Sequence, residues 1–223
     1  MTRINQHPAR RPAKRRAAHR ATVGACVMLF AIGRPSYGQK PVVIPIVPAD
    51  SRVTILVGKA GVFGFASHTH EVVAPVSGGA VTLDEVHPEQ SSVWVELQTE
   101  ALKVTGAGEP AADVAEVQRT MVGERVLNAT KYPKIVFRSR RVRVVSRDGA
   151  LTRLQVEGDL TLRGTTRAVV VPASVLLDAG VLAVSGKFTL KQTDFGIEPV
   201  TAVGGTIRVK DELDITFDAK ARR

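Results

Sequence analysis

Apolar and polar residues alternate with a period of two over long stretches of this 223-residue sequence. The clearest stretch lies near the C-terminus, where apolar residues stand at Ile207, Val209, Leu213, Ile215 and Phe217. Polar residues fill most positions between them, and residues 154–162 and 182–190 show the same alternation. Successive side chains of a β-strand point to opposite faces, so this pattern predicts strands with one apolar and one polar face.

Shorter alternating runs at residues 53–57, 93–97 and 135–137 extend the series, and Gly-rich turns separate the runs, as at 77–79 and 147–149. This spacing predicts about eight strands that pair antiparallel. A chain of one-sided strands can bury its apolar faces by curling on itself. We therefore expect an all-β fold with a short helical insert, an antiparallel barrel of about eight strands. Its interior is either filled by side chains or holds one slender ligand.

Residues 109–128 depart from the period of two. Pro110 suits the first turn of a helix, and Val114, Val117 and Met121 recur at helical spacing. The segment predicts one amphipathic helix or two short ones. A single helical insert in a barrel is well placed to act as a plug or a lid.

The N-terminal 40 residues differ from the rest of the chain in charge. They hold nine of the 31 Lys and Arg residues and no Asp or Glu, so 22 basic and 21 acidic residues remain in the body. A near-neutral body lacks the basic field that phosphate binding needs, and we expect no nucleic-acid partner. The single cysteine, Cys26, also lies in this segment, so the body has no thiol nucleophile and no disulfide.

The same segment has the features of an export signal. A basic stretch precedes the apolar residues 21–32, a run too short to span a bilayer but suited to the apolar part of a signal peptide. Ser36 and Gly38 are small residues placed as a signal peptidase requires for cleavage before Gln39. We expect residues 1–38 to be a cleaved signal peptide. Residues 39–50 are then a proline-rich linker and residues 51–221 the barrel domain.

Three separated motifs follow in order along the body. Residues 121–139 read MVGERVLNATKYPKIVFRS, residues 158–166 read GDLTLRGTT, and residues 191–197 read KQTDFGI. These motifs resemble those of the YceI-like family of bacterial exported proteins, over roughly residues 51–219. The resemblance implies a lipocalin-like barrel with a long apolar cavity that binds polyisoprenoid or similar amphiphilic lipids. It also implies a periplasmic location, and we expect only transient membrane contact.

If the strands form a barrel, a set of apolar side chains faces its interior. Apolar walls would hold a hydrocarbon chain without hydrogen bonds, since each methylene moved out of water gains about 0.8 kcal/mol. The same residues could instead pack a closed core. The candidates are Ile55, Val57, Phe63, Phe65, Leu97, Met121, Val122, Phe137, Leu160, Leu162, Val171, Phe188 and Phe217.

Two histidines, His68 and His70, stand two residues apart on a predicted strand and so share a face. We expect them, with Asp194, to lie near one mouth of the barrel and to contact the head group of the ligand. The alternative is a metal site with His87, Glu71 or Asp194 as third ligand, in a metal-binding protein or a metal-dependent enzyme. The sequence shows no orienting partner for a catalytic base. We therefore expect a binding protein with no cofactor and no catalytic residues, not an enzyme.

Overall fold

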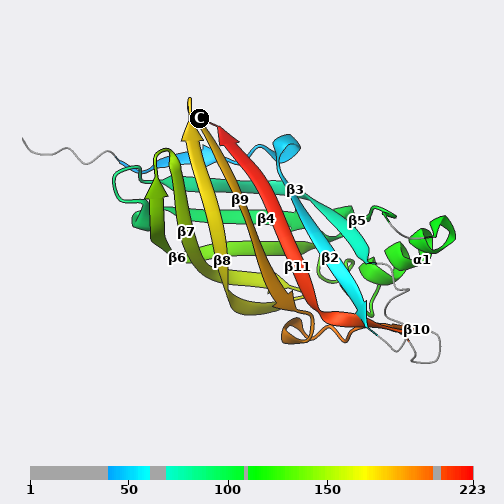
Figure 1. Cartoon of the computed structure of the whole chain (residues 1–223). Helices are drawn as coiled ribbons and strands as arrows, with labels where there is room; N and C mark the ends of the chain where they lie inside the picture. The colour runs from blue at the N-terminus through cyan, green and yellow to red at the C-terminus, as the bar shows by residue number, and fades with distance from the viewer. Residues whose placement is uncertain (1–39, 61–68, 108–109, 203–206, 223) are drawn as a thin grey trace, which may run out of the picture. The chain divides into compact units, whose positions relative to one another are not determined.

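Most of the described part of the chain is β-strand, and it contains one α-helix (Figure 1). The computed structural model describes residues 40–60, 69–107, 110–202 and 207–222, so the predicted signal peptide lies outside it. The strands are β1 (Val42–Pro45), β2 (Arg52–Ala60), β3 (His70–Leu83), β4 (Ser92–Gln98), β5 (Lys103–Val104), β6 (Lys134–Asp148), β7 (Leu151–Leu162), β8 (Thr165–Asp178), β9 (Val181–Lys191), β10 (Thr201–Ala202) and β11 (Ile207–Arg222). The other elements are helix α1 (Ala111–Val122) and the 3₁₀ turns η1 (Pro48–Asp50), η3 (Pro88–Gln90), η4 (Thr99–Ala101) and η5 (Thr193–Phe195).

Eight of these strands form a closed barrel. Neighbouring strands pair in the order β3, β2, β11, β9, β8, β7, β6 and β4, and β4 pairs back with β3 to complete the ring. Every pairing around the ring is antiparallel. The two-residue strands β5 and β10 add to β3 and β11. The all-β antiparallel barrel of about eight strands expected from the sequence is confirmed.

The period of two in the sequence separates the inside of the barrel from its outside. On β11, Ile215 is buried, whereas its neighbours Asp214 and Thr216 are exposed. Ile215 lies opposite Phe188 of β9 and Ile55 of β2 in the strand register. Apolar positions of adjacent strands therefore meet on one face of the sheet, and closure turns that face into the interior.

Strand β6 contains two β-bulges that change which of its residues face inward. Its register with β7 shifts after Ser139 and again after Val144, and each shift adds one residue to β6. The added residues Arg140 and Val145 are exposed. Inward-facing positions are therefore odd-numbered up to the first bulge, as at Phe137, even-numbered between the bulges, and odd-numbered again beyond the second.

The proline-rich segment predicted as a linker, residues 39–50, instead joins the sheet from Val42 onward. Strand β1 pairs antiparallel with the second half of β3, and Ile46 forms a bridge with Ala221 of β11. Strands β1 and β2 thus lie one after the other between β3 and β11, separated by turn η1. The folded unit begins before Ser51, where the sequence analysis placed its start.

The interior side of β1 is part of the hydrophobic core. Ile44 is fully buried and Ile46 nearly so. Gly79 permits this close packing, because a Cβ atom at that position would lie 2.7 Å from the Ile46 side chain. Pro45 is tolerated because it ends the strand, where a missing N–H costs no central ladder bond. The closely spaced prolines therefore indicated a linker, although four of these residues form strand β1.

The predicted helical segment is shorter than the sequence suggested. Helix α1 starts after Pro110 and ends before Gly123, whose N–H donates a hydrogen bond to the Arg119 carbonyl. Beyond it, residues 123–129 form a tight turn closed by main-chain hydrogen bonds, such as that from the Asn128 N–H to the Gly123 carbonyl. No helix in the described residues is long and apolar enough to cross a membrane.

Helix α1 lies at one end of the barrel, beside β5 (Figure 1). One side chain, Gln118, connects the helix to the sheet. Its Oε1 accepts a hydrogen bond of 2.9 Å from the Val104 N–H, and its Nε2 donates one of 2.9 Å to the Leu102 carbonyl. We refer to the end that carries α1 as the helix end, and to the end formed by the loops 84–91, 148–151 and 178–181 as the open end.

Candidate functional site

A cavity of about 930 Å³ occupies the interior of the barrel. All eight barrel strands and α1 contribute to its walls. The walls along the middle of the barrel are aliphatic and aromatic, and polar side chains gather at the two ends. A volume of this size lies near the upper limit of about 1,000 Å³ for small-molecule sites. The interior is therefore a cavity and not the closed core that the sequence left as an alternative.

Most of the apolar candidates from the sequence line this cavity. They come from seven of the eight barrel strands and from α1, and on the strands the period of two places them on the inner face. Phe188 and Phe217 pack edge to face, with their ring centroids 6.5 Å apart. Their role in ligand binding stays a prediction. The predicted residues found on the lining are Ile55, Val57, His70, Leu97, Met121, Phe137, Leu160, Leu162, Val171, Phe188 and Phe217.

The remaining candidates are placed differently. Val122 is not on the cavity lining, because adjacent helical residues point in different directions and Met121 takes the inward position. Asp194 is exposed in η5 and lies off the lining, and its contact with a head group stays a prediction. Phe63, Phe65 and His68 lie outside the described residues.

The helix end of the cavity is lined by several polar side chains. Asp113, Glu116 and Thr120 project from one face of α1 at spacings of three and four residues. His70, at the start of β3, and Gln192, just after β9, are both buried and complete this end. The histidine predicted at a mouth of the barrel therefore does line the cavity, in the company of an acidic helix face.

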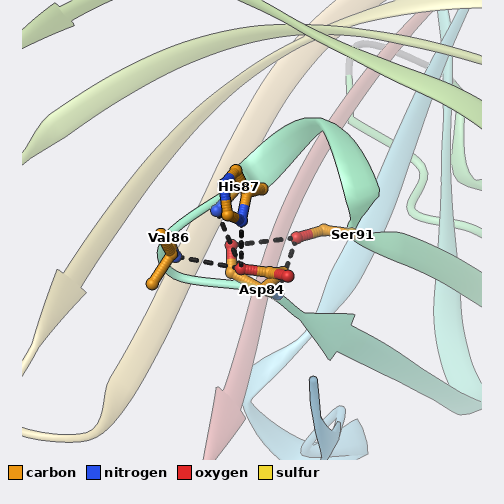
Figure 2. Close-up of polar contacts among 4 residues, drawn as sticks. All are labelled: Asp84, Val86, His87 and Ser91. Carbon is orange, nitrogen blue, oxygen red and sulfur yellow. Dashed lines mark hydrogen bonds and ion pairs between the residues drawn. The ribbon is translucent and has the colours of Figure 1, made fainter. Parts of the chain in front are cut away.

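The loop between β3 and β4 is built around Asp84 (Figure 2). Its Oδ1 accepts hydrogen bonds from the N–H groups of Val86 at 3.0 Å and His87 at 2.7 Å. Its own N–H donates to Ser91 Oγ at 2.9 Å, which fastens the two ends of the loop together. Residues of this loop, including Pro88, line the open end of the cavity.

Aspartate, histidine and serine in one cluster are also the residue types of a hydrolytic triad. Here the Asp84 carboxylate binds main-chain N–H groups, and Ser91 Oγ contacts the main chain of Asp84. His87 Nδ1 lies 3.8 Å from Asp84 Oδ1, and the His87 side chain is 53% exposed. The cluster therefore has the arrangement of a side-chain-stabilised turn that shapes the open end.

The metal site considered from the sequence has no complete set of ligands in the described part of the chain. His70 begins β3, whereas His87 follows the other end of that strand. Glu71 accepts a hydrogen bond of 3.0 Å from the Thr105 hydroxyl. Among the described residues, no group of three or more His, Cys, Asp or Glu side chains could hold a metal ion. His68 falls outside that set.

Arg147 and Thr152 are cavity-lining residues that the sequence analysis missed. They lie directly opposite each other on β6 and β7 at the open end. Strict alternation counted from Phe137 gives Arg147 an inward position, and the two bulges of β6 together leave that position unchanged. The sequence RSRRVRVVSRD itself does not alternate regularly, because each bulge adds one residue, and simple alternation does not locate the bulges. The acidic face of α1 was not predicted either. The spacings of three and four residues between Asp113, Glu116 and Thr120 place these side chains on one helix face and could have indicated it.

A closed antiparallel barrel around an apolar cavity is the architecture of small-ligand-binding barrels. Within that class, the chain belongs to the YceI-like domain family, whose model matches residues 45–221. The match begins inside β1 and ends at the penultimate residue of β11, so it covers the whole barrel. The resemblance inferred from three short motifs is therefore confirmed.

Related sequences occur in Pseudomonas. The chain is 30% identical over 151 residues to a UPF0312 protein of Pseudomonas syringae pv. tomato, a stretch that covers 65% of this chain and 70% of the relative. It is 29% identical over 151 residues to a UPF0312 protein of Pseudomonas savastanoi pv. phaseolicola, with the same coverage.

Two solved structures share the fold at low sequence identity. BcnA of Burkholderia cenocepacia superimposes with a TM-score of 0.62 at 18% identity, over 79% of this chain and 99% of that chain. A polyisoprenoid binding domain from Saccharophagus degradans superimposes with a TM-score of 0.56 at 9% identity, over 82% of this chain and 99% of that chain. Both likenesses concern the barrel fold.

Proposed function

We propose that this protein is exported to the periplasm and holds a polyisoprenoid or similar amphiphilic lipid in its barrel, without covalent chemistry. The observation that carries the proposal is the apolar cavity of about 930 Å³ inside a closed YceI-like barrel. The structural neighbour from Saccharophagus degradans is described as a polyisoprenoid binding domain, which supports the ligand class.

The shape and chemistry of the cavity suit a long hydrocarbon tail. Its middle section, lined by side chains such as Val156, Leu160 and Phe217, offers dispersion contacts to a chain. Each methylene buried there contributes about 0.8 kcal/mol, so a long tail needs no hydrogen bond to bind tightly. The two ends of the cavity are polar, so a head group at either end can stay in contact with water.

The export part of the proposal rests on the basic and apolar leader in residues 1–38. Expression in a Gram-negative host followed by osmotic shock tests it. We expect the shock fluid to contain a protein whose intact mass corresponds to a chain starting at Gln39. Full-length protein retained in the cytoplasm would contradict export without affecting the lipid proposal.

Native mass spectrometry of the protein isolated from periplasm tests lipid binding. We expect a mass excess of several hundred daltons that organic extraction removes. A cavity-filling variant, Val171→Trp, should lose this excess, because Val171 is buried and lines the cavity. Val170→Trp is the matched control: Val170 is the adjacent residue, 49% exposed on the outer face, and its variant should keep the lipid.

Two results would overturn the lipid proposal. One is a wild-type barrel that carries no lipid and binds none when incubated with geranylgeraniol. The other is equal lipid retention by the Val171→Trp and Val170→Trp variants when both are shown to be folded by circular dichroism.

A further inference from the structure

The two ends of the cavity differ in charge. Among the described residues, the ionisable groups on the lining of the helix end are the carboxylates of Asp113 and Glu116, together with His70. At the open end, the lining includes the Arg147 guanidinium and the Glu85 carboxylate. Arg52 and Lys220 also border the cavity, but they hold outward positions on β2 and β11, because Val53 and Ala219 beside them hold the inward positions. An anionic group in the cavity is therefore repelled by the carboxylates of the helix end and finds a guanidinium group at the open end.

Among the cations of the open end, Arg147 is directed inward by the strand register. It pairs with Thr152 of β7, which lies in phase with the cavity-lining residues Leu154 and Val156. The second bulge of β6 produces this phase, since without it the preceding residue, Ser146, would face inward. Bulges commonly re-aim a side chain next to a binding site.

Arg147 also differs in its partners from three other arginines of its strand, and from Arg138, which lies over the Trp94 ring. Arg140 pairs with Asp159 at 3.5 Å, and Arg141 and Arg143 both pair with Glu157, the latter at 2.8 Å. Within the described residues, Arg147 forms no ion pair with a carboxylate. A guanidinium group on a cavity wall, with its donors unused by the protein, is suited to bind a carboxylate or phosphate in a bidentate manner.

We propose that Arg147 binds the anionic head group of the ligand at the open end of the barrel, with the Thr152 hydroxyl beside it, and that the tail extends toward α1. The proposal rests on the proposed function, because it assumes that a lipid tail occupies the cavity. Arg147 is exposed at the mouth, which suits a head group that remains hydrated while its tail is buried. The ligand class is therefore an acidic lipid, either an isoprenoid phosphate or a fatty acid.

Matched pairs of ligands that differ only in the head group test this assignment. Geranylgeranyl phosphate is compared with geranylgeraniol, and palmitate with hexadecanol, by titration into the extracted full-length mature protein. We expect the wild type to bind the acid of at least one pair about tenfold more tightly than the alcohol. The pair with the larger ratio identifies the acid as a phosphate or a carboxylate.

Substitution of Arg147 distinguishes head-group binding from a structural role. The Arg147→Gln variant should lose the preference for the acid while its Kd for the alcohol stays unchanged, and Arg147→Lys should keep part of the preference. Arg153→Gln is the control, because Arg153 lies one residue from Thr152 and faces outward opposite Ser146. This control should bind all four ligands as the wild type does.

Each contrary result has a distinct meaning. If the wild type binds acid and alcohol equally, or if Arg147→Gln keeps the preference, the head-group assignment is wrong and the lipid proposal stands. If Asp113→Asn raises the affinity for the acid and Arg147→Gln leaves it unchanged, the head group lies at the helix end and the proposed orientation is wrong. If the wild type binds none of the four ligands, the proposed function itself fails.

Discussion

Asp211 anchors turn η5 through two hydrogen bonds to a single residue. Its Oδ1 accepts a bond of 2.9 Å from the Thr193 N–H, and its Oδ2 accepts one of 2.7 Å from the Thr193 hydroxyl. Loss of hydration raises the pKa of Asp211, but these hydrogen bonds and the charge of Lys191 lower it by more, so the pKa ends below 3.8. A carboxyl group whose pKa falls on folding stabilises the folded state in its charged form.

The Asp211→Asn substitution should therefore have a pH-dependent effect on stability. The contribution of Asp211 is fully present above its unfolded pKa of 3.8 and is lost as the pH falls through the lower folded pKa. We expect the unfolding free energies of wild type and variant, measured by urea titration, to differ near neutral pH, to begin to converge below about pH 4 and to meet only below the folded pKa of Asp211. Asp218→Asn, on the outer face of the same strand, controls for removal of a charge. A difference between wild type and Asp211→Asn that is the same at all pH values would contradict the prediction.

At the scale of elements, β1 and α1 complete the barrel in different ways. Strand β1 lies between β3 and β11 where β2 does not extend. Its Ile44 side chain is fully buried. Helix α1 covers one end of the cavity, yet none of its residues is fully buried. We infer that β1 contributes mainly to stability, whereas α1 contributes mainly to access.

The contribution of β1 can be measured with two neighbouring substitutions. Ile44→Ala should lower the unfolding free energy by about 2–5 kcal/mol, because it leaves a cavity in the core. Val43→Ala, at a position that is 65% exposed, should change it by less than about 0.5 kcal/mol. Urea unfolding followed by circular dichroism gives both values. Equal effects of the two substitutions would show that residues 42–45 do not pack as β1 in solution.

The attachment of α1 depends on Gln118. Gln118→Leu removes both hydrogen bonds to the β5 segment and leaves the Val104 N–H without this partner, at a local cost of about 1–3 kcal/mol. Hydrogen exchange measured by mass spectrometry should therefore be faster in peptides covering residues 103–122 and unchanged in β7. Gln155→Leu, on β7, serves as the control. Unchanged exchange in α1 of the Gln118→Leu variant would show that apolar contacts alone hold the helix.

At the scale of the whole molecule, the closed ring of strands encloses more space than its side chains fill. The residues that line the cavity lack packing partners on their inner side when it is empty, which forfeits dispersion energy. The outward residues carry ion pairs between neighbouring strands, such as Arg143 with Glu157 at 2.8 Å. The barrel thus depends on closure for its shape and gains stability when a ligand occupies it.

Ligand occupancy should accordingly raise the thermal stability of the protein. With geranylgeraniol at 100 times its Kd, the folded state gains about 2.7 kcal/mol. Scanning calorimetry of extracted protein, with and without the alcohol, should show a higher Tm with the ligand that depends on its concentration. The Val171→Trp variant should show no such shift. A ligand-independent Tm in the wild type would mean that the alcohol does not enter the cavity.

Alternation predicted strands that correspond to β2, β4, β6, β7, β9 and β11, and eleven of the predicted site residues lie on the cavity wall. The turn expected at 77–79 instead lies inside β3. Ile55, Leu160 and Phe217 line the cavity because their strand positions direct them inward whatever the details of pairing. The acidic face of α1 and the inward orientation of Arg147 were not predicted. They depend on where a helix docks and on where a strand gains an extra residue, and both are decided by contacts between distant segments.

The sequence by itself determined the class of secondary structure, the side of each strand that is apolar, and the family. These properties follow from local chemistry, because the period of a strand and the residues of a motif are visible along the chain. Only the tertiary structure decided that the proline-rich residues 42–45 form a strand, that β4 pairs with β3 to close the ring, and that the interior is a cavity. Pairing partners, register and unfilled volume arise between residues far apart in sequence, and no local pattern specifies them.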